Sequence, residues 1–590
     1  MATSNILLGL LNVVTVVVFF ELPTLSVYNT LIIGSEYDYI IVGAGSAGCA
    51  LANRLSADGS KTVLLLEAGG LEDEAVQVPF FAPLLQRTSL DWSYMSVPQQ
   101  NASYLYDGNV NRFPRGKVLG GSSSINYIIY SRGDKRDYDT WNSTYGATGW
   151  SYDDVLPYFV NLERSYLGYN TAYRGSSGEV PVTFPTSRTV ASDAFLEAGE
   201  ELGYDQGDYN SGNQHYFSRV QNNIKNGERW SSSKSFITPN IRARSNLDVG
   251  LFSRVTKVVF QGTTAVGVRY TRYLWTHTVR ARREVILSAG AIGSAHILLL
   301  SGIGPKADLQ SLGIPVIADL PVGQYLQDHL TVNGVAATAK EDIITNYYDP
   351  SIIPQYTFTR TGVLSRPFGV ECVAFVSTPQ ADPEYPDIQF LLSTLNPTTP
   401  EAEYIAREIG ISQVMLDGYY KQKRGQYVFQ IIPILLRPKS TGYIKLNSTD
   451  PTVYPIIDPK FLSNEADWDV AIAGARLAVQ TFQTEAMKRA NVTLFDIPVP
   501  GCETAGALWS DSYLRCLVRQ TAHSGWHPCC TAPMGTHPAA VLDARLRVRS
   551  VSRLRVADAS SMPMELSGNL NIPMMMLGTK AAAMIKEDNA

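Results

Sequence analysis

A complete strand–turn–helix–strand unit near the N-terminus constrains the fold of this chain more than any other feature. The apolar stretch Tyr37–Val42 precedes Gly43, Gly45 and Gly48, and a second apolar stretch ends at Glu67. In such a unit the first glycine permits a tight turn, the second admits the backbone close to a pyrophosphate, and the third lets helix and strand pack closely. The helix N-terminus offers free N–H groups to the phosphates, and the acid accepts ribose hydroxyls. The segment therefore predicts a bound dinucleotide.

Length and charge limit what else the chain can be. At 590 residues it is too long for a single core, so we expect two or more domains. The net charge is -5, and no run of Lys or Arg provides a basic face. Nucleic acid is therefore excluded as an expected partner.

Residues 1–28 are expected to act as a secretory signal. The run Ile6–Phe20 is apolar almost throughout, but it is short for a bilayer span and ends well before the strand at Tyr37. No Lys or Arg precedes the run, so an uncleaved membrane anchor is the alternative. Because no later segment is apolar enough to span a bilayer, we expect a secreted, extracellular protein with no stable membrane span after cleavage.

The glycosylation sequons and the cysteines permit secretion without requiring it. Cys502 and Cys516 are close enough in sequence to form a disulfide in an oxidising compartment. The adjacent Cys529 and Cys530 cannot pair with each other without strain, and Cys49 falls in the first helix. Sequons for a glycoprotein stand at Asn101, Asn142, Asn447 and Asn491.

The remaining pattern predicts an α/β protein with two interleaved domains. Apolar strands return at Leu247–Gly250 and Glu284–Gly290, after a polar insertion. The middle of the chain alternates in short segments between Pro-rich turns, as in an antiparallel sheet. A strand before Asp558 and a helix from Met574 close the chain. We expect a Rossmann-like nucleotide-binding domain from residues 37–150, 235–330 and 526–590, and a substrate-binding domain, built on an antiparallel sheet with helices, from residues 151–234 and 331–525.

Four separated motifs resemble, in order, those of the glucose–methanol–choline (GMC) oxidoreductases, flavoproteins that oxidise alcohols. The motifs are the glycine turn with Glu67, the Gly/Ser cluster Gly116–Gly133 with Gly120, Gly121, Ser122, Ser123 and Asn126, the segment Gly290–Gly304, and the C-terminal pair Trp526-His527-Pro528 and Ser567–Pro573. The resemblance extends from about Tyr37 to Ile585 and implies FAD as the cofactor.

The resemblance also implies which residues hold FAD. Gly43, Gly45, Ser46 and Ala47 would face the pyrophosphate with Gly48 behind them, Glu67 would bind the ribose, and Val255 would contact the adenine through its backbone. On the flavin side the residues are Val118, Gly121, Ser122 and Asn126, and Asp558 and Ala559 would close over the pyrophosphate and ribityl chain. Ala68, Trp526 and Met574 complete the expected FAD-binding set. Some relatives attach FAD covalently through a His just before the signature Asn. That place is Ile125 here, so we expect noncovalent FAD. No metal site is expected.

Alcohol oxidation needs a base with a pKa near the working pH and a second group on the same oxygen. By resemblance, His527 is the base, and Asn569 stands where relatives carry His or Asn. His329 is expected to support the domain junction and His523 to lie behind His527. The other histidines, His215, His277, His296 and His537, are read as structural or surface residues.

Two departures from the family pattern bear on the substrate. Ala295 and His296 replace the usual Pro or Ser followed by Gln, and Cys529-Cys530 replaces Val-Gly after the base. Together with Trp526, the bulky cysteine pair favours an apolar, restricted pocket.

The signal, Asn569 and the motif spacing look most like arthropod members of the family, which include glucose dehydrogenases and oxidases of aromatic carbinols. We expect an oxidase of a small aromatic carbinol, of the mandelonitrile or salicyl alcohol type, with O2 as acceptor. The alternatives are a sugar or choline-type dehydrogenase with another acceptor, and an FAD-containing hydroxynitrile lyase on the same fold. A light-driven fatty-acid decarboxylase and a noncatalytic relative fit the motifs less well.

Overall fold

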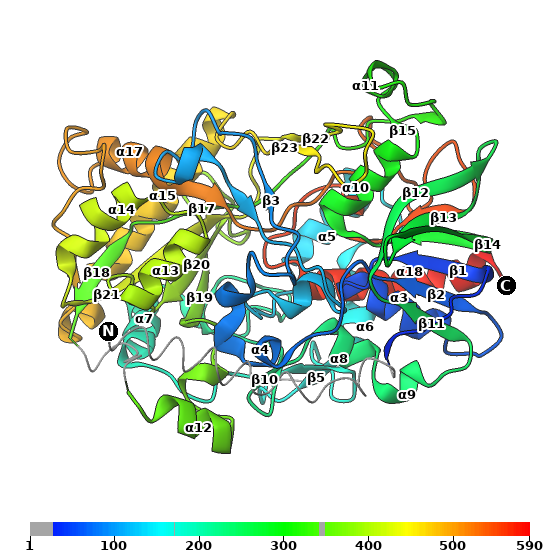
Figure 1. The fold of residues 1–590 in the computed structure, drawn as a ribbon. Coiled ribbons are helices and arrows are strands. Elements are labelled where there is room, and N and C mark those ends of the chain that lie inside the picture. The colour runs from blue at the N-terminus through cyan, green and yellow to red at the C-terminus, as the bar shows by residue number, and fades with distance from the viewer. Residues whose placement is uncertain (1–27, 170–171, 341–348) are drawn as a thin grey trace.

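Two large β-sheets organise the chain in a computed structural model that describes residues 28–169, 172–340 and 349–590 (Figure 1). The first sheet holds the strand–turn–helix–strand unit. Its order is β11 (Leu247–Gly250), β2 (Val63–Leu66), β1 (Glu36–Val42), β14 (Trp275–Leu287), β13 (Thr264–Arg272) and β12 (Ser253–Gln261), with β26 (Leu554–Val556) also paired to β14. This arrangement confirms the α/β class and the return of the nucleotide-binding sheet after the insertion.

Strand β14 joins two kinds of pairing within this sheet. Its second half runs parallel to β1 and β26, whereas its first half is antiparallel to β13. All four residues of β2 are buried, as expected for a parallel strand covered on both faces. The carboxyl ends of the parallel strands therefore meet at one edge, which is where ligands bind in sheets of this kind.

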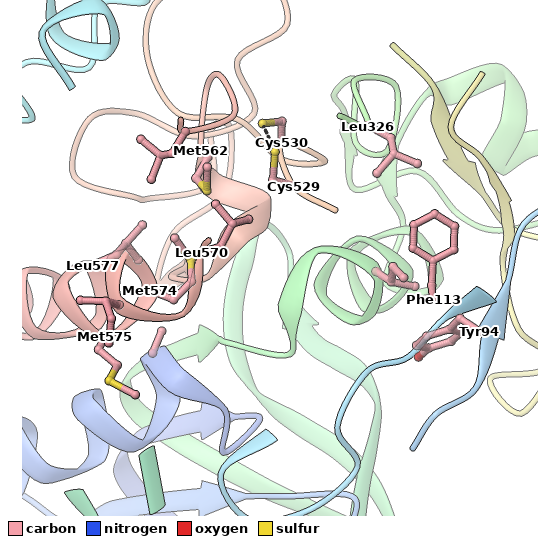
Figure 2. Packing of buried hydrophobic residues seen from close by; sticks show 14 of the residues in the cluster. Tyr94, Phe113, Leu326, Cys529, Cys530, Met562, Leu570, Met574, Met575 and Leu577 are labelled. Carbon is pink, nitrogen blue, oxygen red and sulfur yellow. Dashed lines mark hydrogen bonds between the residues drawn. The ribbon is translucent and has the colours of Figure 1, made fainter. Parts of the chain in front are cut away.

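Two helices from opposite ends of the sequence pack together on the first sheet. They are α3 (Ser46–Leu55), which follows the glycine turn, and α18 (Asn571–Asp588), which closes the chain. Their close approach depends on Gly578, where an added Cβ would stand 2.4 Å from the carbonyl oxygen of Ala47. Met574, Met575 and Leu577 project from α18 in Figure 2 and are buried.

The second sheet is almost entirely antiparallel. Its order is β24 (Thr493–Leu494), β18 (Ala336–Ala339), β21 (Tyr427–Leu435), β20 (Ile388–Ser393), β19 (Val370–Val376), β8 (Tyr216–Arg219) and β7 (Asp205–Gln206). The helix α15 (Glu465–Phe482) packs on β21. These segments fall within the two ranges expected for the substrate-binding domain, whose boundaries stay a prediction.

One short pair of strands connects this sheet to the C-terminal motif. The strand β17 (Leu330–Val332) pairs with both β21 and β25 (Ala522–Ser524). Because Leu330 lies opposite Ser524 in an antiparallel ladder, the residue before β17 and the residues after β25 emerge side by side. His329 is thereby brought next to Trp526 and His527.

The cysteines divide as the sequence predicts. Cys502 and Cys516 form a disulfide with their Cα atoms 5.7 Å apart. Cys529 and Cys530 remain free, buried thiols whose sulfur atoms lie 2.7 Å apart and face one another in Figure 2.

The expected signal peptide lies outside the described residues except for Tyr28. Within the described ranges, every helix is too short or too polar to cross a membrane.

Candidate active site

Two glycine-rich segments approach each other to form a bare backbone surface. Gly43 has a φ of 100°, and an added Cβ would stand 2.5 Å from the carbonyl oxygen of Ser288. Gly121 has a φ of 53°, and its added Cβ would stand 2.6 Å from Cα of Gly45. Neither position tolerates a side chain. The first unit and the Gly/Ser cluster therefore build one cradle, and its lack of side chains fits a pyrophosphate held against backbone N–H groups.

Two buried carboxylates flank this cradle at the strand ends. Glu67 Oε2 accepts a hydrogen bond from Ala44 N at 2.9 Å, and burial raises the pKa of this carboxyl to about 7. Asp558 accepts hydrogen bonds from Gly290 N at 2.9 Å and Ser294 Oγ at 2.5 Å, and burial raises its pKa as well. Both carboxyls are fixed in position, and Glu67 has the position and chemistry that an adenosine ribose requires.

The cradle opens into one continuous cavity of about 410 Å³. The predicted cofactor-binding residues that line it are Gly43, Gly45, Ser46, Ala47, Glu67, Ala68, Gly121, Ser122, Asn126, Val255, Trp526, Asp558, Ala559 and Met574. The other two lie behind the wall. Gly48 packs against the carbonyl of Gly43, and Val118 joins a small apolar cluster with Val76 and Leu85. The set of residues that line the cavity thus fits FAD.

The two expected catalytic residues meet in the same cavity. His527 Nε2 lies 3.2 Å from Asn569 Nδ2, and both residues line the cavity wall. Gln389 Nε2 donates to Asn569 Oδ1 at 3.3 Å, which turns the amide NH2 of Asn569 toward His527. The backbone N–H of His527 donates to Asp328 Oδ1 at 2.7 Å. The imidazole therefore has a fixed direction into the cavity.

A second histidine determines which nitrogen of His527 carries the proton. His329 Nε2 lies 2.8 Å from the carbonyl oxygen of Leu566, which can only accept, so Nε2 of His329 must be protonated. Burial lowers the pKa of His329 to about 4, so the ring is neutral and its Nδ1 is an acceptor. His527 Nδ1 lies 2.8 Å from that atom and must donate to it. Nε2 of His527 is then unprotonated, and its lone pair accepts the hydrogen bond from Asn569 Nδ2 at the cavity wall.

Burial also keeps His527 in its neutral form. Desolvation lowers the pKa of His527 well below its usual value, and the neighbouring His329 and Arg115 lower it further. The ring is thus unprotonated throughout the neutral range, and it is a weaker base than the near-neutral pKa expected from the sequence would give.

The role of His329 differs from the one expected from the sequence. It was expected to support the domain junction, but it contacts the proposed base directly. His523 hydrogen-bonds Asn333 at 3.0 Å and does not contact His527 through a hydrogen bond. His296 also lines the cavity, where it was read as structural or surface.

Aromatic side chains form the wall of the cavity next to His527. The rings of Trp526 and Tyr127 stack with centroids 5.5 Å apart, and Phe368 meets Tyr127 edge-on at 5.7 Å. All three residues line the cavity. Trp526 is held with a φ of 63°, and Arg115 Nη2 donates to its carbonyl oxygen at 2.6 Å. The sequence analysis named Trp526, but it did not single out Tyr127, which lies within the Gly116–Gly133 motif, or Phe368, which lies in no motif.

Asn126 has a partner that sequence reasoning missed. Arg229 Nη1 donates to Asn126 Oδ1 at 2.8 Å, and burial lowers the pKa of this guanidinium to about 9. The two residues are far apart in the chain and Arg229 lies in no motif. Its bond turns the amide NH2 of Asn126 away from the guanidinium, where it is available to an acceptor in the cavity.

Comparison with known proteins agrees with this site. Models of the GMC oxidoreductase N- and C-terminal regions match residues 37–331 and 438–578. Human mitochondrial choline dehydrogenase is 36% identical over 572 residues, which cover 93% of this chain and 90% of that protein. The Drosophila melanogaster glucose dehydrogenase [FAD, quinone] is also 36% identical over 572 residues, covering 93% and 87%.

A solved structure shows the same similarity in three dimensions. The FAD-dependent oxidoreductase from Chaetomium thermophilum matches with a TM-score of 0.78 at 27% identity, covering 94% of this chain and 99% of that one. The chain therefore belongs to the GMC oxidoreductase family, and it is an FAD-dependent oxidoreductase that acts on the CH–OH group of its donors.

Proposed function

We propose that this protein is a secreted oxidase of small aromatic carbinols, of the mandelonitrile or salicyl alcohol type, with His527 as the base and O2 as the acceptor. The observation that carries the proposal is the wall formed by Trp526, Tyr127 and Phe368 beside His527. Aromatic rings pack favourably against an aryl group in offset or edge-on geometry. A carbinol carbon attached to such a group would lie next to the imidazole.

The larger share of apolar side chains on the cavity lining supports an aromatic substrate over a sugar. Gln430 Oε1 already accepts from Tyr420 Oη at 2.8 Å, and Asn333 Nδ2 donates to Tyr106 Oη at 2.9 Å. A sugar would need several groups that converge on its hydroxyls and are free to bond them. Aliphatic side chains that line the cavity include Val370, Leu391, Ile405, Ile409, Ile432 and Ile434.

The residues of the chain supply proton transfer and orientation. Bound FAD supplies the acceptor for the hydride that leaves the carbinol carbon. Asn569 Nδ2 and His527 Nε2 lie 3.2 Å apart, so a substrate hydroxyl can contact both. The lone pair of Nε2 would then take the hydroxyl proton, and the amide NH2 of Asn569 would donate to the same substrate oxygen. Gln389 holds the amide of Asn569 and His329 holds the imidazole of His527 in fixed orientations, so little reorganisation is needed when the substrate enters.

We further propose that FAD is held without a covalent bond. The position that carries a nucleophilic His in some relatives is Ile125, an apolar side chain at the cavity wall. Acid precipitation of the purified protein should release all the flavin into the supernatant. Yellow colour that stays with the precipitate would show a covalent link elsewhere.

Secretion is proposed together with this function. Of the four sequons, Asn447 and Asn491 are exposed, which makes them accessible to glycosylation. The disulfide between Cys502 and Cys516 is typical of an oxidising compartment. Removal of N-linked glycans from protein secreted by insect cells should therefore reduce its apparent mass, and an unchanged mass would argue against both sites.

The substrate class is tested by anaerobic mixing of the flavin-loaded protein with mandelonitrile, salicyl alcohol, glucose and choline in separate experiments. The proposal predicts that flavin absorbance bleaches with an aromatic carbinol and recovers promptly in air, with formation of peroxide. Bleaching by glucose or choline alone would overturn the aromatic assignment. Slow recovery in air would indicate a dehydrogenase with another acceptor, and cleavage of mandelonitrile without bleaching would indicate a lyase.

A further inference from the structure

A group of large apolar side chains is exposed on the first sheet, away from the cavity. Leu274 is 97% exposed, Trp275 74% and Ile32 88%. We name the group the apolar tip, and its members are Leu31, Ile32, Phe252, Tyr273, Leu274 and Trp275. Exposed apolar clusters of this kind mark interaction sites more often than chance exposure does.

The members of the apolar tip are contiguous in space. Tyr273 lies at the turn between β13 and β14, and its ring is 6.1 Å from that of Phe252. Arg272 Nη1, one residue earlier, donates to the carbonyl oxygen of Leu31 at 3.1 Å. Asn29 Nδ2 donates to Tyr273 Oη at 3.2 Å. The N-terminal segment of the described chain is therefore tied to the hairpin, and both present apolar side chains together.

The turn itself is built from residues that fit it poorly. Tyr273 and Leu274 have φ values of 49° and 74°, in the region that Gly, Asn and Asp adopt at low cost. Bulky side chains in this conformation cost about 1–3 kcal/mol per residue. The tip thus carries large apolar groups at positions where small polar residues would make a more stable turn.

Three further observations favour a lipid bilayer as the occupant. Trp, Tyr and aliphatic side chains together are typical of groups that enter the membrane interface. Lys257 and Arg269, paired across β12 and β13, are exposed behind the tip together with Arg280, and such cations attract anionic lipids. Asp248, a carboxylate beside the N-terminal segment, accepts hydrogen bonds from Thr30 and Tyr37.

The position of the N-terminal segment agrees with the same occupant. The apolar run Ile6–Phe20 precedes Asn29 in the sequence, and Asn29 hydrogen-bonds Tyr273 of the apolar tip. We propose that the apolar tip docks the folded protein on an anionic membrane surface, with the side chains of Leu274 and Trp275 entering the interface and no segment spanning the bilayer.

The proposal is tested by fluorescence quenching with vesicles of phosphatidylcholine and phosphatidylserine that carry brominated acyl chains. The chain has 8 Trp residues and none in residues 1–27, so quenching does not depend on whether that segment is retained. We expect brominated lipid to quench the wild-type protein, and Trp275→Phe to remove most of that quenching while leaving vesicle binding intact. Equal quenching of both proteins would overturn the proposal.

A flotation assay with the same lipids provides the matched control. Leu274→Ser/Trp275→Ser should reduce the fraction bound to vesicles by about tenfold or more, because both anchoring side chains are lost. Phe358→Ser removes a side chain that is 85% exposed on the helix α12 (Ile352–Thr359), outside the tip, and should bind like the wild type. An equal effect of both changes, or a change in oligomer size without vesicle binding, would contradict a membrane role.

Discussion

At the scale of single residues, His329 controls His527 without reaching the cavity itself. Its neutral ring accepts the Nδ1 proton of His527, so Nε2 stays unprotonated. Replacing it by Ala should lower kcat by about tenfold to hundredfold, because the productive tautomer is no longer enforced. KM should change little, since His329 does not line the cavity.

The pH profile separates this positioning role from a structural one. The pKa of His527 is depressed, so the neutral base persists as the pH falls, and kcat/KM of the wild type should stay level through pH 6.5. In His329→Ala one cause of the depression is lost, so the acid limb should move up toward 6.5. His523→Ala is the control, because His523 bonds Asn333 and not His527. An acid limb that is the same in all three proteins would show that His329 has no electrostatic effect on the base.

The contrast between Asn569 and His329 shows what a sequence can reveal at this scale. Asn569 lies in a motif and was expected in the cavity, where it lies. The contact between His329 and His527 depends on the antiparallel pairing of β17 with β25, and no local pattern reports a register between distant strands. Arg229 was missed for the same reason, since only the folded chain brings it to Asn126.

At the scale of elements, the approach of the two glycine segments decides whether the cofactor can bind. Gly121→Ala would add a Cβ 2.6 Å from Cα of Gly45, in a backbone conformation with positive φ. We expect FAD affinity to fall by more than about tenfold, measured as the ratio of bound flavin to protein.

Gly59→Ala separates this clash from backbone strain. Gly59 has a φ of 71°, but an added Cβ would have no neighbour within 4 Å. This variant should therefore keep its full complement of flavin. If the two variants lost flavin equally, strain rather than the closed cradle would explain the effect.

Elements with strong local signals were predictable, and those set by tertiary pairing were not. The first unit follows from glycine spacing and apolar strands, and the C-terminal strand and helix appear as β26 and α18. The middle of the chain was expected to form an antiparallel sheet, and within it β22 (Tyr443–Lys445) pairs antiparallel with β23 (Ile456–Asp458) in a separate two-stranded ladder. Alternation predicts a strand, but it does not identify its partner.

At the scale of the whole molecule, the disulfide between Cys502 and Cys516 ties a surface segment of the second sheet's domain. The two residues are separated by 14 positions, and closing a loop of that size stabilises a chain by about 3 kcal/mol. Cys502→Ala/Cys516→Ala should therefore lower the apparent Tm. Dithiothreitol should lower the Tm of the wild type toward that of the variant and leave the variant unchanged. An insensitive wild type would show that the bond contributes nothing.

The central claim is that His527 removes the hydroxyl proton while the substrate is oxidised. The most direct measurement is the rate of anaerobic flavin reduction in His527→Ala, followed by stopped-flow absorbance with the best carbinol. We expect the variant to bind FAD in the wild-type ratio, because the cradle is built by other residues, and to reduce it about 10²- to 10⁴-fold more slowly. Reduction at a rate near that of the wild type would contradict the account and place the base elsewhere.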